Sequence, residues 1–312
     1  MKTLVTGGAG FIGSNLTDRL IREGHKVVIL DNLCTGKKEH LNPKAIFYNI
    51  DIQNPGIYRI FKKEKPDIVF HCAAQIDIRK SVADPVEDAK TNIMGSLSLI
   101  ENFIKIKSKN KKFIFISTGG ALYGDAKVIP TPEDYPAYPL SPYGVAKLTI
   151  ERYLNYYHKV FGLNYVVLRL ANVYGPRQNS EGEAGVVAIF CGKMLSGVRP
   201  IINGTGNKTR DFVFVQDVVE ACVLAMRKNR VGILNIGTSK ETTINTIFRK
   251  LRKLTGINYE EIHGPDKAGE QKRSCLDFKK AKKELGWTPK YNLDKGLEIT
   301  VDWFMNKNNK KF

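Results

Sequence analysis

Three glycines and one aspartate have the spacing of a dinucleotide-binding turn. Gly7, Gly10 and Gly13 follow a short apolar run and open a segment with helical periodicity. Glycine at these points permits a tight turn and lets the backbone approach a diphosphate, whose charge is stabilised by the N-terminus of the helix. Asp31 ends the next apolar run, where a carboxylate accepts a hydrogen bond from an adenosine ribose hydroxyl and repels a 2′-phosphate. The pattern therefore predicts NAD rather than NADP, with a plain glycine turn as the alternative.

A tyrosine and a lysine form the second candidate group. Tyr143 and Lys147 are four residues apart, which places them on one face of a helix. Ser141 can cap this helix, Pro142 suits its first position, and Gly162 ends it. A nearby ammonium lowers the pKa of a phenol from its reference of about 10, so that a tyrosine becomes a usable general base. The pair follows the fifth strand of a dinucleotide-binding pattern, and we therefore interpret it as catalytic.

The elements that must position these residues alternate between strands and helices. The expected strands are continuous apolar runs at residues 3–6, 27–30, 45–48, 67–70, 113–116 and 165–168. Segments with helical periodicity lie between them, at residues 11–23, 55–64, 85–106 and 142–161. Apolar runs of this kind are typical of strands that helices bury on both faces. Repeated β-α units with right-handed crossovers predict an α/β fold with a Rossmann-type doubly wound parallel sheet.

The alternation weakens after residue 170. The later part has two expected strands, at 212–215 and 233–236, and helical segments at 216–228, 243–254, 278–285 and 293–305. We expect residues 1–170 to form the Rossmann domain and residues 171–312 to form a smaller α+β region on its C-terminal side. No low-complexity linker separates the two, so the boundary is expected to be interleaved.

Composition excludes several classes of protein. The chain has 312 residues, and no run of eighteen apolar residues or signal-peptide core is found, which predicts a cytoplasmic protein without a membrane partner. Its five cysteines are scattered without a Cys-x-x-Cys pair, which predicts reduced thiols and no metal site. The formal net charge of +18 comes from lysine runs that are typical of solvated loops and helix faces. We therefore expect anionic substrates rather than a nucleic-acid partner.

Several stretches together resemble one protein family. They are Gly7 to Gly13, residues 31–33, residues 71–74, Asn92, residues 141–144, residues 171–177, residues 210–211 and residues 285–287. On these stretches the chain is similar, over residues 1–305, to the extended short-chain dehydrogenase/reductase family of NAD-dependent epimerases and dehydratases, and specifically to its UDP-glucose 4-epimerase branch. The resemblance implies bound NAD, a UDP-sugar substrate held mainly by residues 171–312, and a homodimer.

The resemblance also implies roles for individual residues. The implied cofactor site contains Gly7, Gly10, Phe11, Ile12, Gly13, Asp31, Asn32, Asp51, Ile52, Ala73, Ala74, Gln75, Asn92, Tyr143 and Lys147. Asn172 and Arg210 match positions that hold the UDP diphosphate. Lys267 stands where the family usually has an arginine on that diphosphate, and Glu270 stands where an aspartate meets the uridine ribose. Ser274 matches a site whose side-chain size gates the sugar pocket, so a small serine there predicts room for an N-acetylated sugar. The alternative is an ordinary strand residue that faces away from the sugar.

One departure from the family concerns a catalytic hydroxyl. Many epimerases carry a serine or threonine where this chain has Gly119. The neighbouring hydroxyls are Ser117 and Thr118, and we expect Thr118 to bond the sugar oxygen, with Ser117 as the second choice. Related 4,6-dehydratases usually have an Asp-Glu pair just after this hydroxyl, where the chain has Gly120 and Ala121. Without an acid and a base at these positions, an epimerase is favoured over a dehydratase.

The sequence therefore predicts an enzyme that reversibly epimerises a UDP-hexose at carbon 4 through a 4-keto intermediate. UDP-glucose and UDP-galactose are the expected pair, and their N-acetylated counterparts are a further expectation. The alternatives are another nucleotide-sugar enzyme, such as a 4,6-dehydratase, and a non-catalytic dinucleotide-binding protein. The dimer seam is expected along the helices at 85–106 and 142–161. Five apolar residues of these helices are expected either to form the seam or to be buried in the core of one chain: Ile93, Leu97, Ile100, Leu154 and Tyr157.

Overall fold

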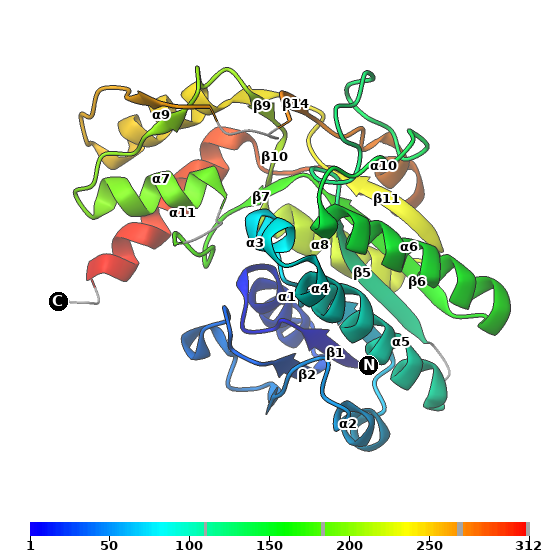
Figure 1. The fold of residues 1–312 in the computed structure, drawn as a ribbon. Helices are drawn as coiled ribbons and strands as arrows, with labels where there is room; N and C mark the ends of the chain where they lie inside the picture. The colour runs from blue at the N-terminus through cyan, green and yellow to red at the C-terminus, as the bar shows by residue number, and fades with distance from the viewer. Residues whose placement is uncertain (109–110, 182–184, 267–270, 310–312) are drawn as a thin grey trace.

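A parallel β-sheet lies at the centre of the computed structural model, which describes residues 1–108, 111–181, 185–266 and 271–309 (Figure 1). Within these residues the sheet has seven strands in the order β11-β6-β5-β4-β1-β2-β3, and all neighbouring pairs are parallel. The strands are β1 (Lys2–Thr6), β2 (Lys26–Asp31), β3 (Ile46–Asn49), β4 (Ile68–His71), β5 (Lys112–Thr118), β6 (Asn164–Leu170) and β11 (Gly232–Ile236). The expected Rossmann-type doubly wound sheet is confirmed.

Helices cover both faces of this sheet. On one face lie α1 (Phe11–Arg22) and α8 (Val215–Arg227), whose apolar residues share one core with α10 (Lys279–Leu285). On the other face a second core joins α2 (Ile57–Glu64), α5 (Ser96–Lys105) and α6 (Pro142–Phe161). Successive strand residues point to opposite faces, so Val5 packs into the first core and Leu4 into the second.

Two elements from the later half of the chain contribute to this sheet. Strand β11 pairs with β6 over Gly232–Ile236 and forms one edge of the sheet. Helix α8, which directly follows the short strand β10 (Phe212–Phe214), lies against α1 on one face. The Rossmann sheet is therefore completed by residues far beyond 170.

The segment expected to be a helix, residues 85–106, is helical from Pro85 to Lys105 and contains a π-helical segment. The chain forms α3 (Ile78–Ala83), α4 (Pro85–Ala89), a π-helical segment η2 (Lys90–Gly95) and then α5. Such π segments often occur at functional sites, and this one contains Asn92. Of the five apolar residues that could serve a seam or a core, three are buried in the chain's own core and two are partly buried against it. The buried ones are Ile100, Leu154 and Tyr157, and the others are Ile93 and Leu97.

The ends of α6 agree with the sequence prediction. The Ser141 hydroxyl accepts a hydrogen bond of 3.2 Å from the Gly144 amide, and Pro142 occupies the first turn. Gly162 ends the helix in the left-handed conformation, with φ of 67°. The cap fixes where the first turn begins, and this turn carries Tyr143.

The smaller region is built around a third core. Helices α7 (Val186–Leu195), α9 (Ile244–Thr255) and α11 (Leu293–Asn309) meet there and lie together at one end of the molecule (Figure 1). Its short strands are β7 (Asn172–Tyr174), β8 (Ile202–Asn203), β9 (Thr209–Arg210), β12 (Thr242–Thr243), β13 (His263–Gly264) and β14 (Arg273–Ser274). Helix α7 was not predicted, because its apolar residues give no clear amphipathic period.

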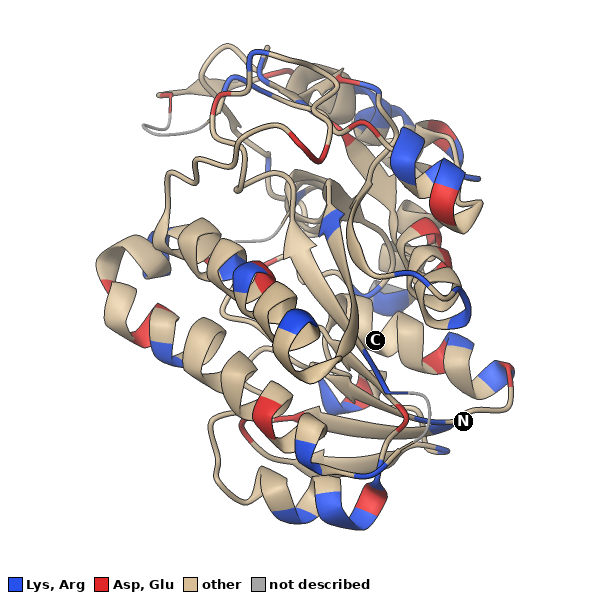
Figure 2. Ribbon diagram, turned by 90° about the vertical axis from the view of Figure 1, so that its right-hand side faces the viewer, with Lys and Arg blue, Asp and Glu red and all other residues tan. Residues whose placement is uncertain are grey.

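The charged side chains are widely distributed. Figure 2 shows lysine and arginine scattered over helices from all parts of the chain and interleaved with acidic residues. This pattern agrees with solvated helix faces rather than a single basic stripe. Among the described residues, no helix combines the length and apolar content that crossing a membrane requires.

Candidate active site

The glycine turn lies where the strand order reverses. Strand β1 has β2 on one side and β4 on the other, and ligands of doubly wound sheets bind at this point. Gly7 follows β1 with φ of +68°, and a Cβ atom on Gly13 would lie 2.2 Å from the Gly7 carbonyl oxygen. Within the described residues no side chain caps α1 at Gly10, so the amides that start the helix at Phe11 and Ile12 face no side-chain acceptor. This cradle suits a diphosphate.

The adenosine end of the expected cofactor site forms beside β2. The Asp31 carboxylate is buried and accepts hydrogen bonds from the amides of Ala9 (2.9 Å) and Leu33 (2.8 Å), and its oxygens keep further lone pairs. The Asn32 amide donates to Asp51 Oδ2 over 2.6 Å. The buried Ile52 follows directly in the chain. These expected residues are therefore brought together at one edge of the sheet, and they fit an adenosine.

The loop after β4 is tied to the π segment. Ala73, whose amide donates to the Thr6 hydroxyl over 3.1 Å, leads through Ala74 into Gln75. The Gln75 amide donates to Asn92 Oδ1 over 3.0 Å, and Asn92 Nδ2 donates back to the Gln75 carbonyl over 2.9 Å. We call this reciprocal pair the Gln75–Asn92 clamp. It fixes the loop that carries Ala73 and Ala74 of the expected cofactor site.

A carboxylate missed by the sequence analysis supports this clamp. Asp88 Oδ1 accepts hydrogen bonds of 2.9 Å from both Gln75 Nε2 and Asn92 Nδ2. Asp88 precedes Asn92 by four residues, and this helical spacing is the signal that could have identified it.

The catalytic pair lies on α6, which packs against β5 and β6. Lys147 is buried, and its Nζ donates to the Ile116 carbonyl over 3.0 Å. Nζ also lies 4.7 Å from the centre of the Phe115 ring and 5.8 Å from the centre of the Tyr143 ring. Burial lowers the pKa of Lys147 to about 8. The lysine therefore changes its charge close to neutral pH.

The pKa of Tyr143 differs from the expectation. Burial, followed by the negative charge of Asp88, raises the pKa of Tyr143 above its ordinary value. The expected lowering by Lys147 is not found, because desolvation of the phenolate outweighs an ammonium that points toward a carbonyl. Activation of Tyr143 thus needs further positive charge or hydrogen bonds to the phenolate.

The structure separates the two candidate hydroxyls. Ser117 is buried and its Oγ donates to Glu151 Oε1 over 2.6 Å. Thr118 at the end of β5 is partly exposed, and its Oγ1 accepts from the Ala121 amide over 3.2 Å. A Cβ atom built on Gly120 would lie 3.9 Å from Thr118 Oγ1 and 3.8 Å from Asn172 Oδ1. Thr118 and Asn172 therefore border the same small space.

A steric reason accounts for the glycine at position 119, where many epimerases have a serine or threonine. A Cβ atom on Gly119 would lie 2.4 Å and 2.6 Å from the two terminal carbons of the buried Leu276. A serine or threonine cannot be placed there without displacing Leu276.

A buried ion pair holds Ser117 in place. The guanidinium of Arg169 on β6 contacts both carboxylate oxygens of Glu151 on α6, with Nε at 3.1 Å from each and Nη2 at 2.6 Å from Oε2. Arg169 also donates to the Tyr123 hydroxyl over 2.7 Å. The pair connects α6, β6 and the loop after Thr118.

A cavity of about 1070 Å³ is lined by Arg210 and by Asn172, the residue that also borders the space at Thr118. Its lining has one acidic side chain, Glu181, and seven basic ones: Lys37, Arg79, Arg177, Lys193, Lys208, Arg210 and Lys307. Lys208 is paired with Asp266, and Lys307 is paired with Glu39. Of the seven basic residues only Arg210 was predicted to have a role, although Arg177 lies in a stretch on which the resemblance to the family rests. Arg177 is held by an ion pair of 2.7 Å with Asp18. Positive charge on a concave surface favours an anionic ligand.

The remaining expected substrate residues are placed only in part. Lys267 and Glu270 lie outside the described residues. Ser274 pairs in register with Arg210 between β14 and β9, and its carbonyl accepts from the Asp211 amide over 2.9 Å. Ser274 is not among the described residues that line the large cavity.

Comparison with known proteins gives the family. The sequence profile of the NAD dependent epimerase/dehydratase family matches residues 3–237. The chain belongs to this family. The expected family and NAD as its cofactor are thereby confirmed. The matched range contains the glycine turn, Asp31 and the Tyr143–Lys147 pair.

Similar proteins have consistent names. A UDP-glucose 4-epimerase of Mycolicibacterium smegmatis is 42% identical over 98% of this chain and 99% of its own. The crystal structure of a Thermotoga maritima UDP-glucose 4-epimerase with UDP-glucose has a TM-score of 0.96 and 50% identity, covering 99% of this chain and 100% of its own. A UDP-N-acetylglucosamine 4-epimerase of Methanobrevibacter ruminantium, in complex with UDP-N-acetylmuramic acid, has a TM-score of 0.93 and 33% identity, covering 98% of each chain. These names agree with the epimerase predicted from the sequence.

Proposed function

We propose that this protein interconverts UDP-glucose and UDP-galactose by 4-epimerisation, with NAD retained in the glycine cradle. The observation that carries the proposal is twofold: Tyr143 and Lys147 lie on the first turns of α6, which follows β5, and Thr118 at the end of β5 borders a space with Asn172, which lines the large basic cavity. The names of the similar proteins support the same reaction.

In the proposed reaction each residue of the site has a separate role. NAD, when bound, supplies a reversible hydride acceptor for carbon 4 of the sugar. Tyr143 removes the proton of the 4-hydroxyl and later returns it, as a general base and then a general acid. Thr118 bonds the same oxygen, and Lys147 supplies positive charge beside the phenolate. Asn172 and Arg210 hold the UDP diphosphate while the 4-keto sugar turns over, so that either face can be reduced.

Elimination of water is disfavoured at this site. A 4,6-dehydratase needs an acid and a base beside the catalytic hydroxyl, and these positions are Gly120 and Ala121. The backbone at Gly120 borders Thr118 and Asn172, so position 120 has no side chain there, and position 121 has only a methyl group. Redox chemistry at carbon 4 needs neither group.

We also propose that the N-acetylated pair is a substrate. The small Ser274 supports this proposal through its register with Arg210, which lines the cavity. The name of the M. ruminantium relative supports it as well.

We further propose a homodimer whose seam lies on α4, η2 and α6. These adjacent helices expose apolar side chains to solvent at Val86, Met94, Val145, Tyr153 and Tyr156. Exposed apolar patches of this kind mark interaction sites, and twofold dimers are the commonest assembly. Light scattering at micromolar concentration checks the proposal, and a monomer mass contradicts it.

The reaction is tested by incubating the purified protein with UDP-glucose without added cofactor. We expect UDP-galactose to form until equilibrium, and NAD to be released when the protein is denatured. A strict need for NADP, or a stable 4-keto-6-deoxy product, overturns the proposal. Bound NAD without any product from a panel of nucleotide sugars indicates a binding protein instead.

A further inference from the structure

Asp88 is a buried carboxylate at the junction of the cofactor loop and the catalytic pair. It is 2% exposed, and its Oδ1 supports the Gln75–Asn92 clamp with two hydrogen bonds of 2.9 Å. Among the described residues, its Oδ2 has no hydrogen-bond partner. A buried carboxylate oxygen without a hydrogen bond is costly, so its charge needs another source of stabilisation.

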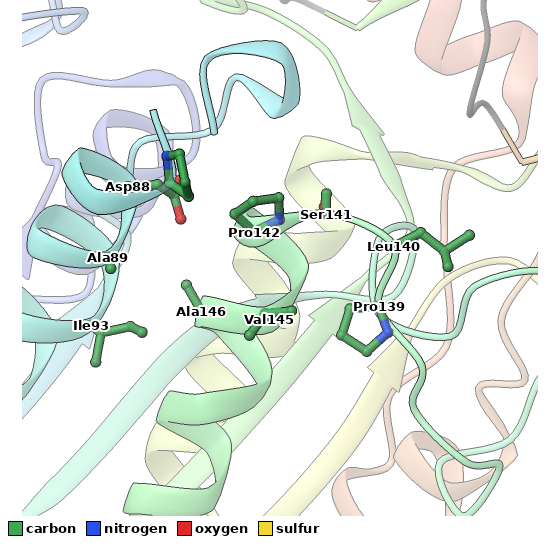
Figure 3. A pocket seen from close by; sticks show the side chains of 10 residues that line it. Asp88, Ala89, Ile93, Pro139, Leu140, Ser141, Pro142, Val145 and Ala146 are labelled. Carbon is green, nitrogen blue, oxygen red and sulfur yellow. The ribbon is translucent and has the colours of Figure 1, made fainter. Parts of the chain in front are cut away.

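The side chain faces the first turns of α6. Helices α4 and α6 are in contact, and a cavity of about 550 Å³ lies along them, lined by Asp88 from α4 and Pro142 from α6 (Figure 3). Tyr143 and Lys147 lie on this part of α6, and the charge of Asp88 raises the pKa of both. Asp88 thus acts electrostatically on the catalytic pair without a direct hydrogen bond to either residue.

Other acidic groups near Lys147 are neutral or already paired. Burial raises the pKa of the Cys72 thiol to about 12, so this group carries no charge at neutral pH. Glu151 is neutralised by the bidentate contact with Arg169. Burial also holds the pKa of His71 well below its usual range, so the imidazole adds no positive charge. Asp88 therefore remains as the uncompensated negative charge around Lys147 among the described residues.

We propose that Asp88 is a positioning residue of this site: one oxygen holds the Gln75–Asn92 clamp, and the carboxylate is the counter-charge that keeps Lys147 protonated. Without this charge, the burial of Lys147 favours the neutral amine, which cannot stabilise a phenolate. Burial raises the pKa of Asp88, whereas the hydrogen bonds from Gln75 and Asn92 and the charge of Lys147 favour its ionised form. The role in catalysis rests on the proposed function, whereas the charge relation between Asp88 and Lys147 does not.

Asp88→Asn separates the two roles, because its amide oxygen can still accept from Gln75 and Asn92 while the charge is lost. We expect the pKa of Lys147, followed by NMR of ¹³C-labelled lysine side chains and assigned with Lys147→Arg, to fall by about 1 unit or more. Both limbs of the pH profile of epimerisation should move to lower pH, because Asp88 raises the pKa of Tyr143 and of Lys147 alike. Glu87→Gln is the matched control, since Glu87 lies on the same helix, is exposed and pairs with Lys90.

An unchanged lysine titration in Asp88→Asn overturns the proposal, as does an equal shift in Glu87→Gln. If the amide is not accommodated in the fold, Asp88→Ser removes the same charge with a smaller side chain and is interpreted in the same way. The NMR titration needs no substrate. Absence of epimerisation in the wild type therefore contradicts the proposed function while leaving the role of Asp88 open to this measurement.

Discussion

The Ser117 hydroxyl donates a hydrogen bond of 2.6 Å to Glu151 and is thereby turned into the core, away from the space that Thr118 and Asn172 border. We therefore predict that Thr118→Val lowers turnover by about ten- to hundredfold, the effect of losing a hydrogen bond worth about 1–3 kcal/mol. Ser117→Ala should instead lower the free energy of unfolding by about 1–3 kcal/mol, because Glu151 loses a buried donor. Steady-state kinetics and urea denaturation of both variants distinguish the effects. The reverse pattern would make Ser117 the catalytic hydroxyl.

Tyr143→Phe tests the general base. Because the phenol hydroxyl alone is removed, the variant should keep its fold and its NAD while turnover falls by about 100- to 10,000-fold. NAD content, thermal unfolding and epimerisation of UDP-glucose give the comparison. A variant within a few-fold of the wild type would assign proton transfer to another group.

Activity should fall as pH rises above about 8, where Lys147 loses its proton. This loss cannot be unfolding caused by Lys147. The folded pKa of about 8 lies below the ordinary value of 10.5, so the unfolded chain binds this proton more tightly. Lys147 therefore contributes more stability, not less, as pH increases between these two values. Parallel pH profiles of kcat/KM and of unfolding check the prediction, and an alkaline limb that coincides with unfolding contradicts it.

Two adjacent glycines should respond differently to alanine. Gly119→Ala places a methyl group within 2.6 Å of Leu276 carbons and should cost about 1–3 kcal/mol of stability. In a double-mutant cycle with Leu276→Ala, this penalty should disappear. Gly120→Ala meets only ordinary contacts near 3.8 Å, so stability should change by less than about 0.5 kcal/mol while substrate binding weakens. Equal stability losses in both variants would contradict the packing described around position 119.

Ser274→Tyr tests the width of the sugar pocket. We expect the wild type to epimerise UDP-N-acetylglucosamine as well as UDP-glucose, and the variant to lose the acetylated substrate selectively, by roughly ten- to hundredfold, because overpacking costs about 1–3 kcal/mol. The ratio of kcat/KM values for the two substrates is the measurement. Since Ser274 does not line the described cavity, equal losses for both substrates would place the gate elsewhere.

Local spacing was sufficient to predict much of the fold and part of the site. The turn from Gly7 to Gly13, the cap at Ser141 and the four-residue interval from Tyr143 to Lys147 depend on the geometry of one turn or one helix, and neighbours in the chain determine that geometry. The continuous apolar strands predicted a parallel sheet for the same reason, because burial on both faces leaves a simple local pattern.

Contacts between segments that are far apart in the sequence determined the rest of the site and the burial of its helices. Ser117 and Thr118 cannot be distinguished locally, since the choice depends on Glu151 and Arg169, which reach the end of β5 from other elements. Asp88 becomes relevant because folding brings the ends of α4 and α6 together around it. The apolar residues Ile100 and Leu154 fitted a dimer seam and a core equally well in sequence, and packing buried them within one chain. Periodicity shows which side of a helix is apolar, whereas only the folded chain shows what that side contacts.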